Sequence, residues 1–441
     1  MALQAFKYAL DPTPGQVRAL ASHAGAARFA FNWALARIKA NMEQRAAERS
    51  YGIDEAGLTP AVGWSLPALR RAWNQAKAEV APWWAENSKE AYSAGLDNLA
   101  RGLKNWADSR GGKRGGRRVG FPRFKKRGRA RDSFRYTTGS FGPDGNHRVK
   151  LPRIGRVKVH EPMTTLTAEV AAGKAQIKSV TISRTAQRWF ASFTVEVARD
   201  TCTPPKGAPV GVDVGIKHLA VLSTGEQVPN PRHLTGALRR LRRASRAFSR
   251  TRKGSANRRK RAQRLASIHA RVANLRSDGL HKLTTRLATS HAVVVVEDLN
   301  VAGMVRNRRL ARHIADASFG ELRRQLAYKT CWYGSTLQVA GRWFPSSKTC
   351  SACGHVKTKL PLAMRVYDCT HCGLVLDRDL NAALNLAQLV VAPSGGETLN
   401  ACGADRKTEP RSASGRETGI PHPTRVRREP SPSNGRILEH H

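Results

Sequence analysis

Four cysteines near the carboxyl end of the sequence constrain its fold more than any other feature. They form two Cys-x2-Cys pairs separated by fifteen residues, and the four are Cys350, Cys353, Cys369 and Cys372. This spacing lets four thiolates surround one tetrahedral zinc ion. A glycine follows each pair, Gly354 and Gly373, as a tight turn around a metal requires. The alternative, two pairs of unliganded thiols, leaves these glycines unexplained.

A zinc ion held by four sulfur atoms has no open position for a substrate. The predicted zinc is therefore structural, and any chemistry must come from other residues. The motif DRDLNAALNL, residues 377–386, follows the second cysteine pair almost at once and supplies acidic side chains.

The charge of the chain points to a polyanionic partner. Lys and Arg total 76 against 32 Asp and Glu, a formal net charge of +44. Charge of that size repels itself in a compact state, and counterion release on a nucleic acid is the usual reason to carry it. A membrane surface is the alternative, but no apolar run approaches the roughly eighteen residues of a spanning helix, and no signal peptide opens the chain. With an odd count of seven cysteines, a cytoplasmic, reducing setting is expected.

The first two hundred residues predict helices inserted into a strand-rich unit. Residues 1–12 alternate as a strand, and Thr13 with its flanking prolines predicts the start of a helix. Residues 13–108 show helical spacing, with tryptophans more typical of a core than of base stacking. Residues 109–203 contain short alternating runs typical of antiparallel strands and predict a small β-barrel.

A basic loop within residues 109–131 predicts a nucleic-acid contact. Glycine and proline preclude a regular helix there. Basic and aromatic side chains interleave, as suits a loop that follows a phosphate backbone and stacks on bases; the candidates are Phe121, Arg123, Phe124 and Lys125. A solvated basic linker is the alternative.

Residues 204–342 predict an α/β unit with a very basic helical segment at 234–290. Four consecutive valines, 293–296, predict a central strand buried on both faces. The basic segment carries arginines on nearly every side without matching acids, which favours phosphate contact over a merely solvated face. The candidates are Arg239, Arg240, Arg242, Arg243, Arg258, Arg259, Lys260 and Arg261.

Three acids stand at the edges of this predicted unit. Asp213 lies in an apolar strand, Glu297 follows the valine strand, and Asp379 begins the last helix. A carboxylate cluster in a basic protein is the arrangement that holds two magnesium ions about 4 Å apart for phosphodiester hydrolysis. Each acid alone could instead pair with a nearby arginine. Hard oxygen ligands suit magnesium and thiolates suit zinc, so the two metals are sorted between two sites.

Several motifs resemble those of TnpB proteins, the RNA-guided nucleases of insertion sequences, which are ancestral to type V CRISPR effectors. The RuvC and zinc-finger motifs are VGVDVGIK (210–217), VVVEDL (294–299), SSKTCSACG (346–354) and CGLVLDRDLNAA (372–383). The amino-terminal part carries PTPGQ (12–16), RFAFN (28–32), GFPRFK (120–125) and LPRIG (151–155), which are also similar to that family.

The resemblance implies a multidomain α+β fold: a wedge β-barrel with an inserted helical recognition lobe, and an RNase H-like RuvC domain with an inserted zinc finger. It assigns 343–376 to the zinc finger and 377–392 to the closing helix. Asp213, Glu297 and Asp379 match the catalytic triad, and the four cysteines match the zinc ligands. Asp377 is expected to cap the helix or support the triad.

The resemblance also implies the partners: a guide RNA, double-stranded target DNA and a displaced single strand, with one protein chain per RNA and action at the bacterial nucleoid. Guide pairing would supply sequence specificity. Alternatives are a miniature type V CRISPR effector, a non-cleaving RNA-guided regulator and, ranked low, a DNA-joining transposase. Residues 393–441 lack periodicity and are expected to be disordered.

Overall fold

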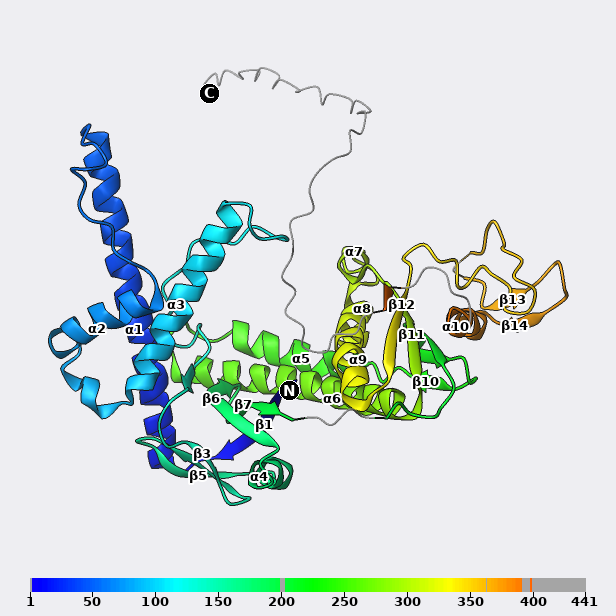
Figure 1. Cartoon of the computed structure of the whole chain (residues 1–441), viewed down its shortest axis with the longest axis horizontal. Coiled ribbons are helices and arrows are strands. Elements are labelled where there is room, and N and C mark those ends of the chain that lie inside the picture. Colours follow the sequence, from blue (N-terminus) through cyan, green and yellow to red (C-terminus); the bar gives the residue numbers. More distant parts are fainter. Residues whose placement is uncertain (1, 199–202, 362, 391–396, 399–441) are drawn as a thin grey trace, which may run out of the picture. The chain divides into compact units, whose positions relative to one another are not determined.

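The computed structural model describes residues 2–198, 203–361, 363–390 and 397–398 (Figure 1). Buried side chains in these ranges form two main hydrophobic cores, one from residues up to Val197 and one from Val210 onward. Both combine helices with a sheet, so the chain is a multidomain α+β protein, as the sequence predicts.

The amino-terminal core joins a long helix pair to a sheet. Thr13 caps α1 with a capping box, because its hydroxyl accepts from the Gln16 amide and the Gln16 side chain accepts from the Thr13 amide. Side chains of the helices and the strands share this core; for example, the His23 ring lies 5.3 Å from the Phe134 ring. The elements are β1 Ala2–Asp11, α1 Pro14–Ser50, α2 Leu66–Val80, the 3-10 turn η1 Pro82–Glu86, α3 Lys89–Arg110, β2 Ser133–Tyr136, β3 Gly142–Asp144, β4 Arg148–Leu151, β5 Gly155–Val159, α4 Thr164–Ala171, β6 Ala175–Thr185 and β7 Arg188–Val197.

The seven strands of this part form one sheet in the order β2-β6-β7-β1-β5-β4-β3. The first strand of the chain, β1, pairs with β7 and β5, so the helices α1 to α3 lie in sequence between strands of one sheet. No pairing between the end strands β2 and β3 occurs among the described residues, so a closed barrel stays a prediction.

The second core surrounds a six-stranded sheet in the order β10-β9-β8-β11-β12-β15. Strands β8, β11 and β12 are parallel, and β9, β10 and β15 run antiparallel to their neighbours. The elements are β8 Val210–Asp213, β9 His218–Leu222, β10 Gln227–Pro229, α5 His233–Ser249, α6 Ala256–Ser290, β11 Val293–Glu297, α7 Val301–Met304, α8 Ala311–Ala317, α9 Phe319–Tyr333, β12 Thr336–Ala340, β13 Val366–Asp368, β14 Val375–Asp377, α10 Arg378–Gln388 and β15 Glu397–Thr398.

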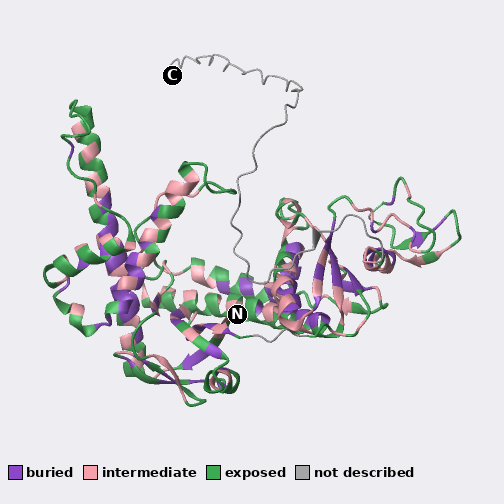
Figure 2. Cartoon of the chain, viewed as in Figure 1, coloured by how far each residue is buried: buried purple, intermediate pink, exposed green. Residues whose placement is uncertain are grey.

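Helices cover both faces of this sheet, which explains the run of valines. Val294 and Val296 pack in one cluster with leucines of α6 and α9, whereas Val295 packs with Leu386 of α10. Alternate side chains of β11 therefore meet helices on opposite faces. Figure 2 shows buried residues along these strands.

Helix α10 lies unusually close to β8. A Cβ atom added to Gly211 would lie 1.9 Å from the Ala383 carbonyl oxygen and 2.6 Å from the Ala387 amide nitrogen, both of α10. Only glycine permits this approach. The start of α10, which carries Asp379, is thereby placed against the strand that carries Asp213.

A small segment that carries the four cysteines, residues 343–376, lies between β12 and α10 in the sequence. Its strands β13 and β14 pair antiparallel, and its small core contains Cys350, Cys369, Leu360 and Tyr367. We call this segment the ribbon. With so few buried apolar side chains, we expect it to depend on its cysteines for stability.

The predicted disordered tail, 393–441, lies outside the described residues except for Glu397 and Thr398, which form the edge strand β15. Across the described helices, none is long and apolar enough to cross a membrane.

Candidate active site and zinc centre

The carboxyl ends of two neighbouring parallel strands bring two of the predicted acids together. Val212 of β8 pairs with Val296 of β11, so the next residues, Asp213 and Glu297, end their strands side by side. Asp379 lies in the first turn of α10, which packs on β8. All three side chains are partly buried. This edge of an α/β sheet is where such folds place their binding sites.

The nearby negative charges affect the pKa of the Asp213 carboxyl. Burial, followed by repulsion from Glu297 and Asp379, raises its pKa to about 8, although Arg378 opposes the shift. A carboxyl held in this way stabilises a bound cation, because the cation removes both the repulsion and the cost of burying the negative charge. The three predicted acids therefore act as one electrostatic unit.

The neighbouring Asp298 has a different role. Its carboxylate accepts from Arg323, and also from Arg342 at 2.6 Å. The hydrogen bond from Arg323 contributes most to holding the pKa of Asp298 below its usual range. Because Asp298 is already matched by two guanidinium groups, Glu297 is the acid of this pair that faces the cluster without a basic partner among the described residues.

Asp377 caps the helix that carries Asp379. Its Oδ1 accepts from the Asp379 and Leu380 amides at 2.9 and 3.1 Å. This confirms the predicted capping role. The guanidinium of Arg365, from the ribbon, lies 3.8 Å from Asp379 Oδ1 and is about half exposed, so it is a weak and displaceable partner.

A serine and two asparagines link the ribbon to this site, and the sequence analysis missed all three. The Ser346 hydroxyl donates to Glu297 Oε1. Asn385 Nδ2 donates to the Ser346 and Thr349 carbonyls, both at 2.7 Å. Asn381 donates to the Thr349 carbonyl at 2.7 Å and accepts from the Ser351 amide at 2.9 Å. The asparagines lie four residues apart on one face of α10, a spacing that was available as a signal.

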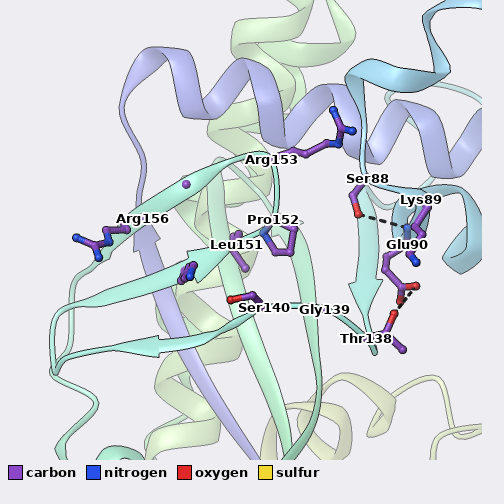
Figure 3. Close-up of a pocket in the computed structure, with 12 residues that line it drawn as sticks. Ser88, Lys89, Glu90, Thr138, Gly139, Ser140, Leu151, Pro152, Arg153 and Arg156 are labelled. Atoms are coloured by element: carbon purple, nitrogen blue, oxygen red, sulfur yellow. Dashed lines mark hydrogen bonds between the residues drawn. The ribbon is translucent and has the colours of Figure 1, made fainter.

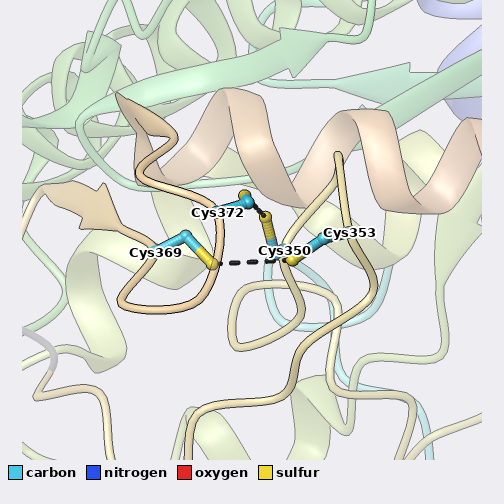
Figure 4. A group of neighbouring side chains, drawn as sticks. All are labelled: Cys350, Cys353, Cys369 and Cys372. Carbon is cyan, nitrogen blue, oxygen red and sulfur yellow. Dashed lines mark hydrogen bonds between the residues drawn. The ribbon is translucent and has the colours of Figure 1, made fainter.

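The four predicted zinc ligands converge (Figure 4). Their sulfur atoms all lie within 4.8 Å of one another, with 3.6 Å between Cys350 and Cys372 and between Cys353 and Cys369. Zinc–sulfur bonds of about 2.3 Å at tetrahedral angles require sulfur atoms about 3.8 Å apart. The residues therefore fit a zinc ion.

Two matching turns hold the cysteines. The Gly354 amide donates to the Cys350 carbonyl at 3.0 Å, and the Gly373 amide donates to the Cys369 carbonyl at 2.9 Å. Both glycines have left-handed backbones, with φ of 77° and 73°. The predicted need for a glycine after each pair is thus met by a conformation that other residues rarely adopt.

The basic candidates on α5 and α6 divide into two groups. Seven are exposed and form no ion pair with any described residue: Arg239, Arg240, Arg242, Arg243, Arg259, Lys260 and Arg261. Arg258 differs, because it donates to the Phe248 and Thr251 carbonyls at 3.2 and 2.9 Å and stacks over the Phe248 ring. Its contacts close the turn between the two helices.

The loop candidates also divide. Phe121 packs edge-on against Trp106, with 5.0 Å between the ring centres, whereas Phe124 is 46% exposed. Lys125 is fixed by its backbone, because its amide donates to the Asn32 side chain at 2.8 Å. Arg123 is exposed. The surface that this loop offers a ligand is therefore centred on Arg123 and Phe124.

Two of the cavities in the described residues lie beside charged side chains. One, of about 370 Å³, is bordered by Glu297, Asp298, Arg323 and Arg342 beside the acidic cluster. The other, of about 610 Å³, lies between the start of α3 and strands β4 and β5, and Lys89, Arg153 and Arg156 line it (Figure 3). Glu90, at its border, accepts from Thr137 and Thr138.

A carboxylate cluster at the edge of an α/β sheet, hydrogen-bonded to a four-cysteine ribbon in a strongly basic chain, is the arrangement expected of a metal-dependent nuclease. Family profiles match three segments: one described as a probable transposase at 192–308, a Cas12f1-like TNB domain at 319–386 and a helix-turn-helix domain at 1–46. In the structure, residues 2–46 form β1 and part of one continuous helix, α1.

Relatives match nearly the whole chain. A protein of Mycobacterium tuberculosis is 42% identical over 94% of this chain and 93% of its own length, and one of Escherichia coli is 32% identical over 91% and 94%. Both carry the name "Putative RNA-guided DNA endonuclease". The chain belongs to the TnpB family.

A solved Cas12f1–sgRNA–target DNA complex also resembles the chain, covering 85% of it and 82% of the Cas12f1 chain, with 14% identity and a TM-score of 0.47. At that score the likeness supports no inference.

Proposed function

We propose that this chain is an RNA-guided DNA endonuclease, which binds a guide RNA, recognises a short motif beside its target and cleaves the target DNA with a magnesium-dependent site. Full-length relatives with that name support the proposal. The observation that carries it is the convergence of Asp213, Glu297 and Asp379 at one sheet edge. A non-cleaving regulator would have no need of this costly cluster.

Asp213, Glu297 and Asp379 would hold the magnesium ions. Their oxygen donors suit a hard cation, and the raised pKa of Asp213 reflects negative charge that a cation would relieve. Two magnesium ions bound there would activate a water molecule and stabilise the leaving oxygen of the phosphodiester. The protein's part is to hold the three carboxylates in place: Asp213 and Glu297 by strand pairing, and Asp379 by the capped start of α10.

Zinc in the ribbon would act as a structural ion. Its four thiolates fill a tetrahedral shell, and the surrounding backbone is tied to α10 by Asn381 and Asn385. The ribbon would therefore fix the distance between Ser346 and α10. Ser346 is hydrogen-bonded to Glu297, and α10 carries Asp379.

The remaining parts would hold nucleic acid. The exposed arginines of α5 and α6 would contact phosphates of the guide or of the heteroduplex, and Arg123 and Phe124 would contact a backbone and a base. The sheet of β1 to β7, as a wedge, and the helices inserted in it, as a recognition lobe, would read the flanking motif. The basic cavity at Lys89 and Arg153 is our candidate position for that contact.

The test uses the protein with the RNA that co-purifies with it. Sequencing that RNA identifies the guide, and a plasmid library with a matching target and randomised flanks identifies the motif. Wild-type protein should cleave the selected plasmid with magnesium, whereas Asp213→Ala should bind it without cleavage. Binding without cleavage by the wild type would refute the nuclease proposal and favour the regulator. The mass of the complex tests one chain per RNA, and a repeat array beside the gene, rather than transposon ends, would indicate a CRISPR effector.

A further inference from the structure

The segment that joins β12 to the ribbon is attached to Glu297 at both of its ends. Ala340, the last residue of β12, pairs with Glu297 in the parallel ladder. Ser346, six residues later, donates its hydroxyl hydrogen to the Glu297 carboxylate. The residues between them, 341–345, therefore form a short arch that starts and finishes at one predicted catalytic residue.

Further hydrogen bonds fix the shape of this arch. The Phe344 amide donates to the Gly341 carbonyl at 2.9 Å, and the Ser346 amide donates to the Phe344 carbonyl at 2.9 Å. Arg342 donates to Asp298, the neighbour of Glu297, at 2.6 Å. Phe344 packs inward against the cluster of Val295, Ala340 and Leu386. The arch is thus a built part of the site.

Trp343, at the top of the arch, is turned outward and is 90% exposed. No other large apolar side chain in the described part of the chain is as exposed. An indole is a large apolar surface with a flat π face, and proteins seldom leave one in water without a partner. Its two neighbours in the chain are both packed or paired, so the exposure is a property of this position alone.

The position of Trp343 close to the three carboxylates indicates which kind of molecule would contact its indole. It lies three residues from Ala340, and three extended residues span at most about 11 Å. Nucleotides are spaced by at least about 3.4 Å along a strand. This indole is therefore about as near to the carboxylates as a base within about three nucleotides of a phosphate bound there. In a chain of charge +44, nucleic acid is the partner that the surroundings attract.

Resting on the nuclease function proposed above, we propose that Trp343 binds the single strand to be cut by stacking on one of its bases, next to the phosphate held at Asp213, Glu297 and Asp379. Stacking tolerates any base, because every base has a π face. It therefore suits an enzyme whose sequence choice is made elsewhere by guide pairing. Trp343 also requires an unpaired base, so it would favour single-stranded over duplex DNA in the cleft.

The experiment measures single-turnover cleavage by the complete protein–RNA complex on targets that carry one abasic nucleotide at each position around the cut. Wild type should lose about five- to a hundredfold in rate at one or two positions, where the stacked base is missing. Trp343→Ala should be slower on the intact target by a similar factor and should show no further loss at those positions. Trp343→Phe should recover most of the rate, and Trp343→Leu, which lacks a π face, should not.

The control is Val375→Ala, which trims an exposed apolar side chain elsewhere on the ribbon and should match wild type on every target. Zinc content and the melting temperature verify that each variant is folded. If wild type cleaves but Trp343→Ala equals it, or remains sensitive to the same abasic positions, the stacking proposal is wrong while the nuclease proposal stands. A wild type that binds its target without cutting it overturns the nuclease proposal instead.

Discussion

At the scale of single residues, the site concentrates negative charge that either a proton or a bound cation relieves. Asp213 ends a buried strand, and burial with two nearby carboxylates raises its pKa to about 8. A pKa raised from 3.8 to about 8 corresponds to roughly 6 kcal/mol between the charged and neutral forms. Stability given up in this way is typical of a binding site.

Asp213→Asn should therefore stabilise the metal-free protein while abolishing cleavage. Because the folded state holds the Asp213 proton more tightly than the unfolded state, wild-type stability falls as pH rises from about 4 to about 8. The melting temperature of the variant should match that of wild type near pH 4 and exceed it by about 5 °C at pH 8. Adding magnesium at pH 8 should reduce this difference in melting temperature, because it should stabilise the wild type and not the variant. Equal melting temperatures at pH 8 would contradict this account.

That these acids lie together could be predicted from the sequence, but their hydrogen-bond partners could not. An aspartate in an apolar strand is conspicuous, because a buried charge needs a reason. Ser346 gives no such signal in the sequence, because serines are common in loops. Only the folded structure shows that its hydroxyl donates to Glu297. Likewise, the contacts of Phe121 with Trp106 and of Arg258 with Phe248 depend on the folded arrangement of residues distant in sequence.

At the scale of elements, the contact of α10 with β8 decides whether the site can form. The absence of a side chain at Gly211 lets the two backbones meet, and Asp379 reaches Asp213 only through that contact.

Gly211→Ala should abolish or strongly reduce cleavage and lower the melting temperature, because the added Cβ would overlap the Ala383 carbonyl and displace α10. Gly279→Ala is the matched control. Gly279 is exposed in α6 with nothing near its added Cβ, so that substitution should be neutral or stabilise by up to about 1 kcal/mol. Thermal denaturation and cleavage rates of the two variants separate these outcomes. If Gly211→Ala cleaves at the wild-type rate, α10 can shift away from β8 without loss of activity, and this prediction is wrong.

The ribbon makes a second prediction at this scale. Replacing Cys350 and Cys353 by serine should release about one zinc ion per chain. Cleavage should fall as well. Without zinc, the backbone groups of Ser346, Thr349 and Ser351 should move out of position, and these groups form the hydrogen bonds that hold Asn381 and Asn385 of α10. A colorimetric zinc assay and plasmid cleavage are the measurements, and Ser351→Ala, which removes a hydroxyl beside the ligands, should keep both zinc and activity. A zinc-free variant with full activity would refute the coupling.

Most element positions followed from local signals. The Thr13 cap predicted a helix boundary and the run of four valines a buried strand, each to within a residue or two. The closure of the first sheet could not be predicted in this way. Alternation identifies strands, but the partner of each strand depends on contacts between residues far apart in the chain.

At the scale of the whole molecule, the positive charge is distributed unevenly between paired and unpaired side chains. Arg286 is matched by Glu226, whereas Arg239, Arg242 and Arg243 on α5 have no acidic partner among the described residues. Unmatched arginines on a folded surface repel one another and are tolerated when a polyanion covers them.

Replacing Arg239, Arg242 and Arg243 together by alanine should weaken guide-RNA binding and reduce its dependence on salt. Each lost phosphate contact should lower the slope of log affinity against log salt concentration by about 0.7 to 0.9. Arg286→Ala is the control, because its charge is already offset by Glu226 and its loss should leave the slope nearly unchanged. Affinity measured from about 50 to 200 mM salt tests both. Identical slopes for the two variants would exclude α5 from the RNA-binding surface.

The packing of α10 against β8 also sets the time at which the protein first becomes able to cut. During synthesis, Asp213 and Glu297 leave the ribosome well before Asp379, and the four cysteines come between. A nascent chain therefore lacks the third carboxylate until the ribbon has been made and α10 has docked at Gly211. A copy that ends before Asp379 lacks the complete acidic cluster, so under the proposed mechanism it would not cut DNA.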